Sequence, residues 1–391
     1  MSTGHPELIA AITSEIAASG PIPFVRFMEL ALYHPQYGYY MRHPEPAHER
    51  IGWRGDFYTS SDVHPILGQA LAKQAEQMYR LLGQPHPFTI VEMGAGKGLL
   101  AKHIISTCAH RYPSFFQHLR YVLIDRSPAM RELQRRNLAS WLDQPNLLEW
   151  VDDLANMAPH SLTGLFFSNE LVDSFPVHRV QVTAKGIEEL WVDYRDGGFV
   201  ECLLPLSSDT LAHRLRRVSV DWPEGYRTEI NLRASDWMKQ VAQHLGRGFV
   251  LTIDYGHTAQ DLYRSDRKRG TFLCYFQQSM NEEPFLRVGE QDMTAHVDFS
   301  SLAVTGEEQK LRTTGFTNQM SFLMGLGVEQ MIAELEQDSP QFRAAIHLLR
   351  PNGMGTTFKI LIQHKGLSQP ELDGLQYKPF FASALTMQSA A

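Results

Sequence analysis

The chain has 391 residues, 43% of them hydrophobic and 20% charged, a composition typical of a soluble globular protein with one or two domains. Its formal net charge of -7 provides no global attraction for DNA or RNA, so we expect no nucleic-acid partner. No stretch approaches 18 uninterrupted apolar residues, and we therefore expect no membrane-spanning helix. The three cysteines are too far apart for a metal or redox motif, and the N-terminus lacks a targeting pattern. These features predict a cytoplasmic protein without a bound metal.

The first 85 residues have the pattern of a helical region. Apolar residues at helical spacing predict helices over residues 6–19, 24–32 and 65–82. A cluster of tyrosines, Tyr33, Tyr37, Tyr39 and Tyr40, follows the second helix, and such a cluster is more often part of the core than a ligand platform.

Short apolar runs alternate with helical patterns from residue 88 onward. The runs that predict buried strands cover residues 89–93, 121–124, 147–151, 164–167 and 248–253, and a late strand over 359–363 is expected at the sheet edge. This alternation indicates an α/β fold with a doubly wound, mostly parallel sheet. Polar and apolar residues alternate between turns over residues 177–206, which predicts an inserted antiparallel meander. We expect a main domain over residues 86–366, followed by a tail over residues 367–391.

A glycine-rich loop, Glu92-Met93-Gly94-Ala95-Gly96-Lys97-Gly98, joins the first of these strands to the next helix. Glycines at 94, 96 and 98 permit positive φ and a close approach of the backbone to a ligand. Leu99 replaces the third glycine of the dinucleotide fingerprint, which argues against an NAD(P)-dependent oxidoreductase. Glu92 could meet the ammonium of an amino-acid moiety. A plain strand-to-helix turn remains the alternative.

The next two strands also end in acids. Asp125 could accept hydrogen bonds from both hydroxyls of a ribose, and Asp152 could bind an adenine amino group. Either residue alone could be a solvated turn aspartate. Three neighbouring strands that end in acids after a glycine loop nevertheless predict one crevice at the carboxyl ends of the sheet. Its ligand would combine amino-acid, ribose and adenine parts, as S-adenosylmethionine does.

Polar residues after the fourth strand are the candidates for the reaction itself. Asn169, Glu170 and Asp173 should lie at the crevice, with Asn169 toward the cofactor and the two acids near the transferred methyl group. Carboxylates suit a cationic acceptor such as guanidinium, which they bind bidentately and can hold in line with the sulfonium. Both acids could instead cap a helix or contact only the cofactor. His296 is a weaker candidate for a base, with capping of the following helix as the alternative.

The motifs, taken in order, resemble those of the MidA-like family of class I S-adenosylmethionine-dependent methyltransferases. The matching segments are residues 20–24, 33–40, 55–60, 92–98, 169–176, 253–256 and 289–298. The resemblance covers nearly the whole chain, roughly Pro21 to Lys365.

This resemblance implies a Rossmann-like class I fold, S-adenosylmethionine as methyl donor, and protein arginine N-methylation, the activity of the mitochondrial member. It places Glu92, Gly94, Gly96, Asp125 and Asp152 on cofactor positions, and Asp56 and Thr59 on an N-terminal lid. It also implies a protein substrate, by analogy a subunit of the respiratory NADH:quinone complex; a homodimer is possible. Two alternatives stay open: an assembly factor that binds the cofactor with little turnover, and a small-molecule methyltransferase.

Overall fold

The computed structural model describes residues 3–42, 52, 55–56, 63–218, 222–351, 353–379 and 385. In this described part an eight-stranded sheet has the order β15-β16-β10-β5-β2-β3-β4, with β14 beside β10. Its strands are β2 (Phe88–Met93), β3 (Leu119–Ile124), β4 (Leu148–Val151), β5 (Leu162–Asn169), β10 (Leu245–His257), β14 (Val297–Asp298), β15 (Arg312–Asn318) and β16 (Phe358–Lys365). The path from β4 to β10 is parallel throughout, and β16 is antiparallel to both of its neighbours. The expected doubly wound α/β fold is confirmed.

Helices cover both faces of this sheet. Ile90 and Val91 are adjacent in β2, both fully buried, and belong to different hydrophobic clusters, because successive side chains of a strand point to opposite faces. One face packs against α4 (Ile66–Leu81), α5 (Leu99–Arg111), α12 (Gln319–Gly325), α13 (Val328–Ala333) and α14 (Pro340–Leu349). The other face packs against α9 (Leu232–His244) and α11 (Phe299–Glu308). The remaining helices of this part are α6 (Pro113–Phe116), α7 (Pro128–Asn137), α10 (Ala259–Leu262) and α15 (Met354–Thr357).

The expected edge position of the late strand is wrong. β16 lies between β10 and β15, so β15 forms that edge of the sheet. The segment of β15, Arg312–Asn318, has few large apolar residues and is mostly half-buried or exposed. Hydrophobic pattern alone therefore does not identify this strand.

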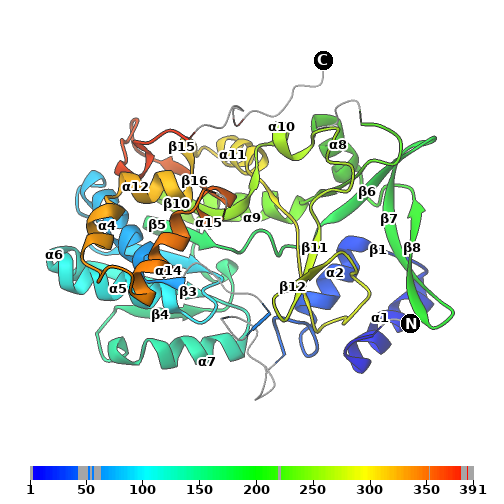
Figure 1. Ribbon diagram of the computed structural model, residues 1–391, viewed down its shortest axis with the longest axis horizontal. Helices are drawn as coiled ribbons and strands as arrows, with labels where there is room; N and C mark the ends of the chain where they lie inside the picture. Colours follow the sequence, from blue (N-terminus) through cyan, green and yellow to red (C-terminus); the bar gives the residue numbers. More distant parts are fainter. Residues whose placement is uncertain are drawn as a thin grey trace.

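The inserted segment forms a second sheet, and a strand from the N-terminal region is part of this sheet. Strand β7 pairs with β6 and β8 and also, antiparallel, with β1, while β9 extends the sheet beyond β6. Figure 1 shows this sheet beside α1 and α2, at the end of the molecule away from α4 and α5. The elements of this region are α1 (Pro6–Ser19), β1 (Ile22–Pro23), α2 (Phe24–Tyr33), β6 (His178–Thr183), β7 (Gly186–Arg195), β8 (Gly198–Leu204), α8 (Asp209–Val218) and β9 (Arg227–Ile230). A small sheet of β11 (Leu273–Phe276), β12 (Ser279–Asn281) and β13 (Asp292–Thr294) lies nearby, and β13 contacts α2.

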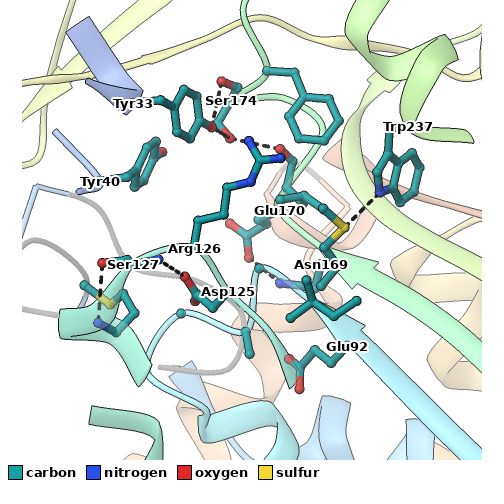
Figure 2. Close-up of a pocket in the computed structure, with 18 of the residues that line it drawn as sticks. Tyr33, Tyr40, Glu92, Asp125, Arg126, Ser127, Asn169, Glu170, Ser174 and Trp237 are labelled. Carbon is teal, nitrogen blue, oxygen red and sulfur yellow. Dashed lines mark hydrogen bonds between the residues drawn. The ribbon is translucent and has the colours of Figure 1, made fainter. Parts of the chain in front are cut away.

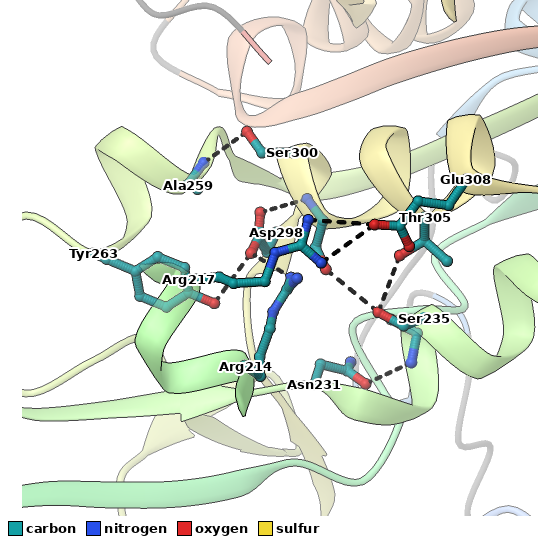
Figure 3. A network of polar contacts seen from close by, with 12 residues as sticks. Arg214, Arg217, Asn231, Ser235, Ala259, Tyr263, Asp298, Ser300, Thr305 and Glu308 are labelled. Atoms are coloured by element: carbon teal, nitrogen blue, oxygen red, sulfur yellow. Dashed lines mark hydrogen bonds and ion pairs between the residues drawn. The ribbon is translucent and has the colours of Figure 1, made fainter. Parts of the chain in front are cut away.

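A buried polar network attaches the insert to the main sheet (Figure 3). Asp298 caps α11 by accepting the backbone N–H of Ser301 at 2.9 Å. Its second carboxylate oxygen accepts from Arg214 of α8 and from the Tyr263 hydroxyl, each at 3.2 Å. Since Arg214 and Asp298 are both about nine-tenths buried, removing one partner would leave an uncompensated charge in the interior.

Part of the C-terminal segment packs against α4. Asp373 accepts from Gln77 of α4 at 2.8 Å, and the Gly374 N–H donates to Gln74 at 3.1 Å. The proposed domain boundaries at residues 85 and 366 stay a prediction. Among the described helices, none combines the length and the apolar character needed to cross a membrane.

Candidate functional site

A cavity of about 320 Å³ opens where β2, β3 and β5 end, which is the expected crevice (Figure 2). A volume of this size is typical of small-molecule sites. The cavity brings together six of the twelve expected site residues. Those that line it are Glu92, Gly94, Gly96, Asp125, Asn169 and Glu170.

The glycine loop has the backbone conformation expected of it. The φ angles of Gly94, Gly96 and Gly98 are 73°, 51° and 75°, a region that side chains other than glycine rarely adopt. Gly98 is the N-terminal cap of α5, and a Cβ on it would lie 3.2 Å from the Cα of Gln134. Both conformation and close packing therefore require glycine at this position.

Glu92 is buried at the end of β2. Its carboxylate accepts a hydrogen bond from the Tyr121 hydroxyl at 2.6 Å. Burial raises the pKa of Glu92 to about 7, against the opposing effect of this hydrogen bond. A cationic group in the cavity would stabilise the ionised form and lower this pKa.

Asp125 is tied to the glycine loop by a residue that the sequence did not single out. Gln134 of α7 donates from one amide nitrogen to Asp125 at 2.8 Å and to the Gly96 carbonyl at 2.9 Å, and its oxygen accepts from Trp150 at 3.1 Å. The Ser127 N–H donates to the other carboxylate oxygen of Asp125 at 2.9 Å. Burial raises the pKa of Asp125 to about 6. A glutamine in an amphipathic helix carries no distinctive sequence signal. The role of Gln134 in linking Asp125 to the glycine loop is visible only in the structure, where its side chain is fully buried.

Asn169 and Glu170 follow one another at the end of β5. The Asn169 amide donates to the Glu170 carboxylate at 3.0 Å, and the Glu170 N–H donates to the Ile253 carbonyl at 3.0 Å. Glu170 has a φ of 53°, which is uncommon outside glycine, and such strain concentrates at functional sites. The buried Asn169 carbonyl oxygen has no hydrogen-bond partner among the described residues.

Asp173 lies behind the cavity and does not line it. Its carboxylate accepts from the Tyr255 hydroxyl, and its pKa is raised to about 6 by burial. Asp254 organises this turn: one of its carboxylate oxygens accepts the backbone N–H groups of Leu171, Val172 and Asp173 at 3.3, 2.9 and 3.3 Å. Asp254 thereby holds the segment that begins with Glu170.

His296 also lies outside the cavity lining. Its Nδ1 is 3.1 Å from Nε2 of His257, and burial lowers its pKa to about 4, so the ring is neutral at physiological pH. It does not cap the following helix, because Asp298 does. Within the described ranges, no group of three His, Cys, Asp or Glu side chains is arranged to hold a metal ion.

Three of the other expected cofactor residues, Gly98, Asp152 and Asp56, are not on the cavity wall. The Asp152 side chain is 72% exposed and pairs with Arg131. Asp56 is fully buried and accepts from the Tyr39 hydroxyl at 2.7 Å and from the Gln277 N–H at 2.8 Å. Thr59, expected on the same lid, lies outside the described residues.

Aromatic residues complete the cavity. Trp237 of α9 lines it, with its indole N–H 3.2 Å from the Met93 sulfur. Tyr33 and Tyr40 line it as well, whereas Tyr39 is fully buried. As expected, the four tyrosines lie in or pack against one hydrophobic core cluster, and Tyr33 and Tyr40 line the cavity in addition.

The sequence matches known families. A family model described as "Putative S-adenosyl-L-methionine-dependent methyltransferase" matches residues 70–317. A relative from Drosophila melanogaster, named protein arginine methyltransferase NDUFAF7 homolog, mitochondrial, is 26% identical over 95% of this chain and 88% of its own length. The human protein arginine methyltransferase NDUFAF7, mitochondrial, is 25% identical over 94% of this chain and 86% of its own length. These names contradict the expected cytoplasmic location, because both relatives are mitochondrial proteins.

The fold also matches solved structures. A protein from Burkholderia thailandensis, solved bound to S-adenosyl-homocysteine, has 30% sequence identity and a TM-score of 0.84, covering 96% of this chain and 97% of its own. A native crystal structure from the same organism has a TM-score of 0.83 and 30% identity, covering 97% of this chain and 98% of its own.

Proposed function

Because the chain belongs to this family of S-adenosyl-L-methionine-dependent methyltransferases, we propose that it methylates an arginine side chain of a protein partner. The observation that carries the proposal is Glu170, a carboxylate in strained backbone on the wall of the cavity that the glycine loop also lines. A carboxylate there suits a guanidinium acceptor. The names of the curated relatives support the same acceptor.

The cavity residues fit S-adenosylmethionine. Glu92 is buried and offers a carboxylate to the ligand ammonium, and Asp125 offers one to the ribose hydroxyls. The unpartnered carbonyl oxygen of Asn169 is a buried acceptor that a ligand donor would satisfy. When bound, S-adenosylmethionine supplies a methyl group on a positively charged sulfur.

Glu170 would serve this reaction in two ways. Its carboxylate would hold the guanidinium so that one nitrogen faces the methyl group, and such positioning accounts for much of a transfer barrier. Guanidinium remains protonated at physiological pH, so a proton must leave the nitrogen as the new N–C bond forms and the S–C bond breaks. Glu170 is placed to accept that proton.

The acceptor protein is proposed by analogy alone. By the resemblance to the mitochondrial member, we propose a subunit of the respiratory NADH:quinone complex as the partner. Glu170 and the cavity favour a cationic side chain as the acceptor.

The test follows a labelled methyl group. Purified protein and S-adenosylmethionine labelled in the methyl group are incubated with a lysate from cells that lack this chain, and the labelled protein is hydrolysed to amino acids. We expect label in methylated arginine with the native protein and none with Glu170→Gln. Calorimetry with S-adenosyl-homocysteine provides the control, since Glu170→Gln should keep its affinity within about threefold.

Two outcomes contradict the proposal. Label in a small molecule, with none in protein, would assign a small-molecule methyltransferase. Label in arginine at an undiminished rate with Glu170→Gln would remove Glu170 from the reaction.

A further inference from the structure

The cavity has two chemically different ends. Figure 2 shows Glu92 at one end, Tyr33, Tyr40 and Ser174 at the other, and Glu170 between them. The first end carries the glycine loop and the acid proposed for the cofactor. The second end carries two tyrosine rings and Ser174, and Arg126 lines the same cavity.

Tyr33 and Tyr40 form one wall at that second end. Their rings stack with centroids 5.4 Å apart and an interplanar angle of 27°, and both are partly exposed to the cavity. The Tyr33 hydroxyl lies 2.9 Å from the Ser174 hydroxyl and 3.1 Å from the Ser174 carbonyl. Tyrosine faces attract cations, and guanidinium groups also stack on them.

Two buried acids lie directly behind this wall. The Tyr40 hydroxyl donates to Asp292 at 2.6 Å, and Asp292 is 3% exposed. Asp173, in the same turn as Ser174, is buried as well, and one of its carboxylate oxygens has no hydrogen-bond partner in the described part of the chain. Neither acid pairs there with an Arg, Lys or His side chain. A phenol that donates to a carboxylate is polarised, which makes its ring face more attractive to a cation.

We propose that Tyr33 and Tyr40 form the subsite that receives the cationic side chain of the acceptor, and that Asp292 is a positioning residue that orients Tyr40. This subsite rests on the proposed arginine methylation. It assigns specificity for the acceptor to Tyr33 and Tyr40, which are separate from the glycine loop and from Glu170. Stacking on the free face of a tyrosine ring favours a planar guanidinium over a compact ammonium.

The test measures separately what the tyrosine rings, the Tyr40 hydroxyl and the Asp292 carboxylate contribute to acceptor binding. The labelled-methyl assay is repeated at several dilutions of the lysate. The acceptor concentration then varies, and kcat and KM for the labelled acceptor can be determined separately. We expect Tyr33→Leu and Tyr40→Leu to raise KM about 30-fold, as loss of a desolvated cation–π contact implies. Tyr40→Phe and Asp292→Asn keep the ring and should raise KM by only about threefold to tenfold, while Asp292→Glu should partly restore the native value.

Two controls keep the result interpretable. Affinity for S-adenosyl-homocysteine should stay near the native value in Tyr33→Leu, Tyr40→Leu and Tyr40→Phe. Each variant should still unfold cooperatively, at a Tm lowered by the loss of the tyrosine hydrogen bonds. If Tyr40→Leu remains folded and keeps the native KM, the subsite is refuted; if its cofactor affinity falls as much as its acceptor affinity, the tyrosines belong to the cofactor end. Failure of the native protein to label arginine would refute the proposed function instead, so the two failures are distinguishable.

Discussion

Cofactor binding should depend on pH through Glu92. The carboxyl is buried against Tyr121, and its pKa is raised to about 7. A ligand ammonium interacts favourably only with the ionised form, so binding must expel a proton at any pH below this value. Affinity for S-adenosyl-homocysteine should therefore rise as the pH increases.

The size of the effect follows from the raised pKa. With a pKa of about 7, roughly a tenth of Glu92 is ionised at pH 6 and about nine-tenths at pH 8. The Kd should fall about tenfold between these two pH values. Asp125, with a pKa of about 6, adds at most about a further twofold, because about half of it is already ionised at pH 6.

Isothermal titration calorimetry at pH 6, 7 and 8 measures this slope directly. Glu92→Gln keeps an oxygen that accepts from Tyr121 and should bind more weakly at pH 8 with a nearly flat pH profile. Asp152→Asn, at an exposed site away from the cavity wall, should keep the native slope. A flat profile in the native protein, or an unchanged slope in Glu92→Gln, would refute the assignment of Glu92 to the ligand ammonium.

Two further substitutions test how the site is supported. Gln134→Leu leaves the Gly96 carbonyl, Asp125 and the Trp150 N–H without the partner that Gln134 provides. Urea denaturation should therefore show a loss of roughly 2 kcal/mol in the free energy of unfolding, and S-adenosyl-homocysteine should bind more weakly. Unchanged stability would mean that water replaces the amide. Asp254→Ala removes the acceptor of three backbone N–H groups behind Glu170, so methyl transfer should fall at least about tenfold while cofactor affinity changes by less than about threefold. Equal losses of transfer and binding in that variant would show a general collapse of the site.

Local pattern was sufficient to predict the parallel strands of the main sheet and the glycine loop. Strand β2 is an apolar run with both faces buried, and Gly94, Gly96 and Gly98 all adopt positive φ. Acids at the ends of neighbouring parallel strands lie at one edge of a sheet, so Glu92, Asp125 and Glu170 could be assigned to one cavity from strand order. The same reasoning failed for Asp152, whose exposed side chain lies off the cavity wall.

Other parts of the site depend on contacts between residues distant in the chain. Tyr40 reaches the cavity while Tyr39 is buried against Asp56, and adjacent tyrosines in one motif carry no signal that separates them. Asp173 is three residues from Glu170 but lies behind the cavity, because Asp254 of another strand folds the intervening turn.

The sequence by itself determined the class of fold, the carboxyl-end crevice and the residues of its loop, since these follow from short-range periodicity and backbone sterics. Only the tertiary structure decided the position of β16, the burial of Gln134 and the aromatic end of the cavity. Each of these depends on which distant surfaces pack together, and the free energy of that packing is spread over the whole chain.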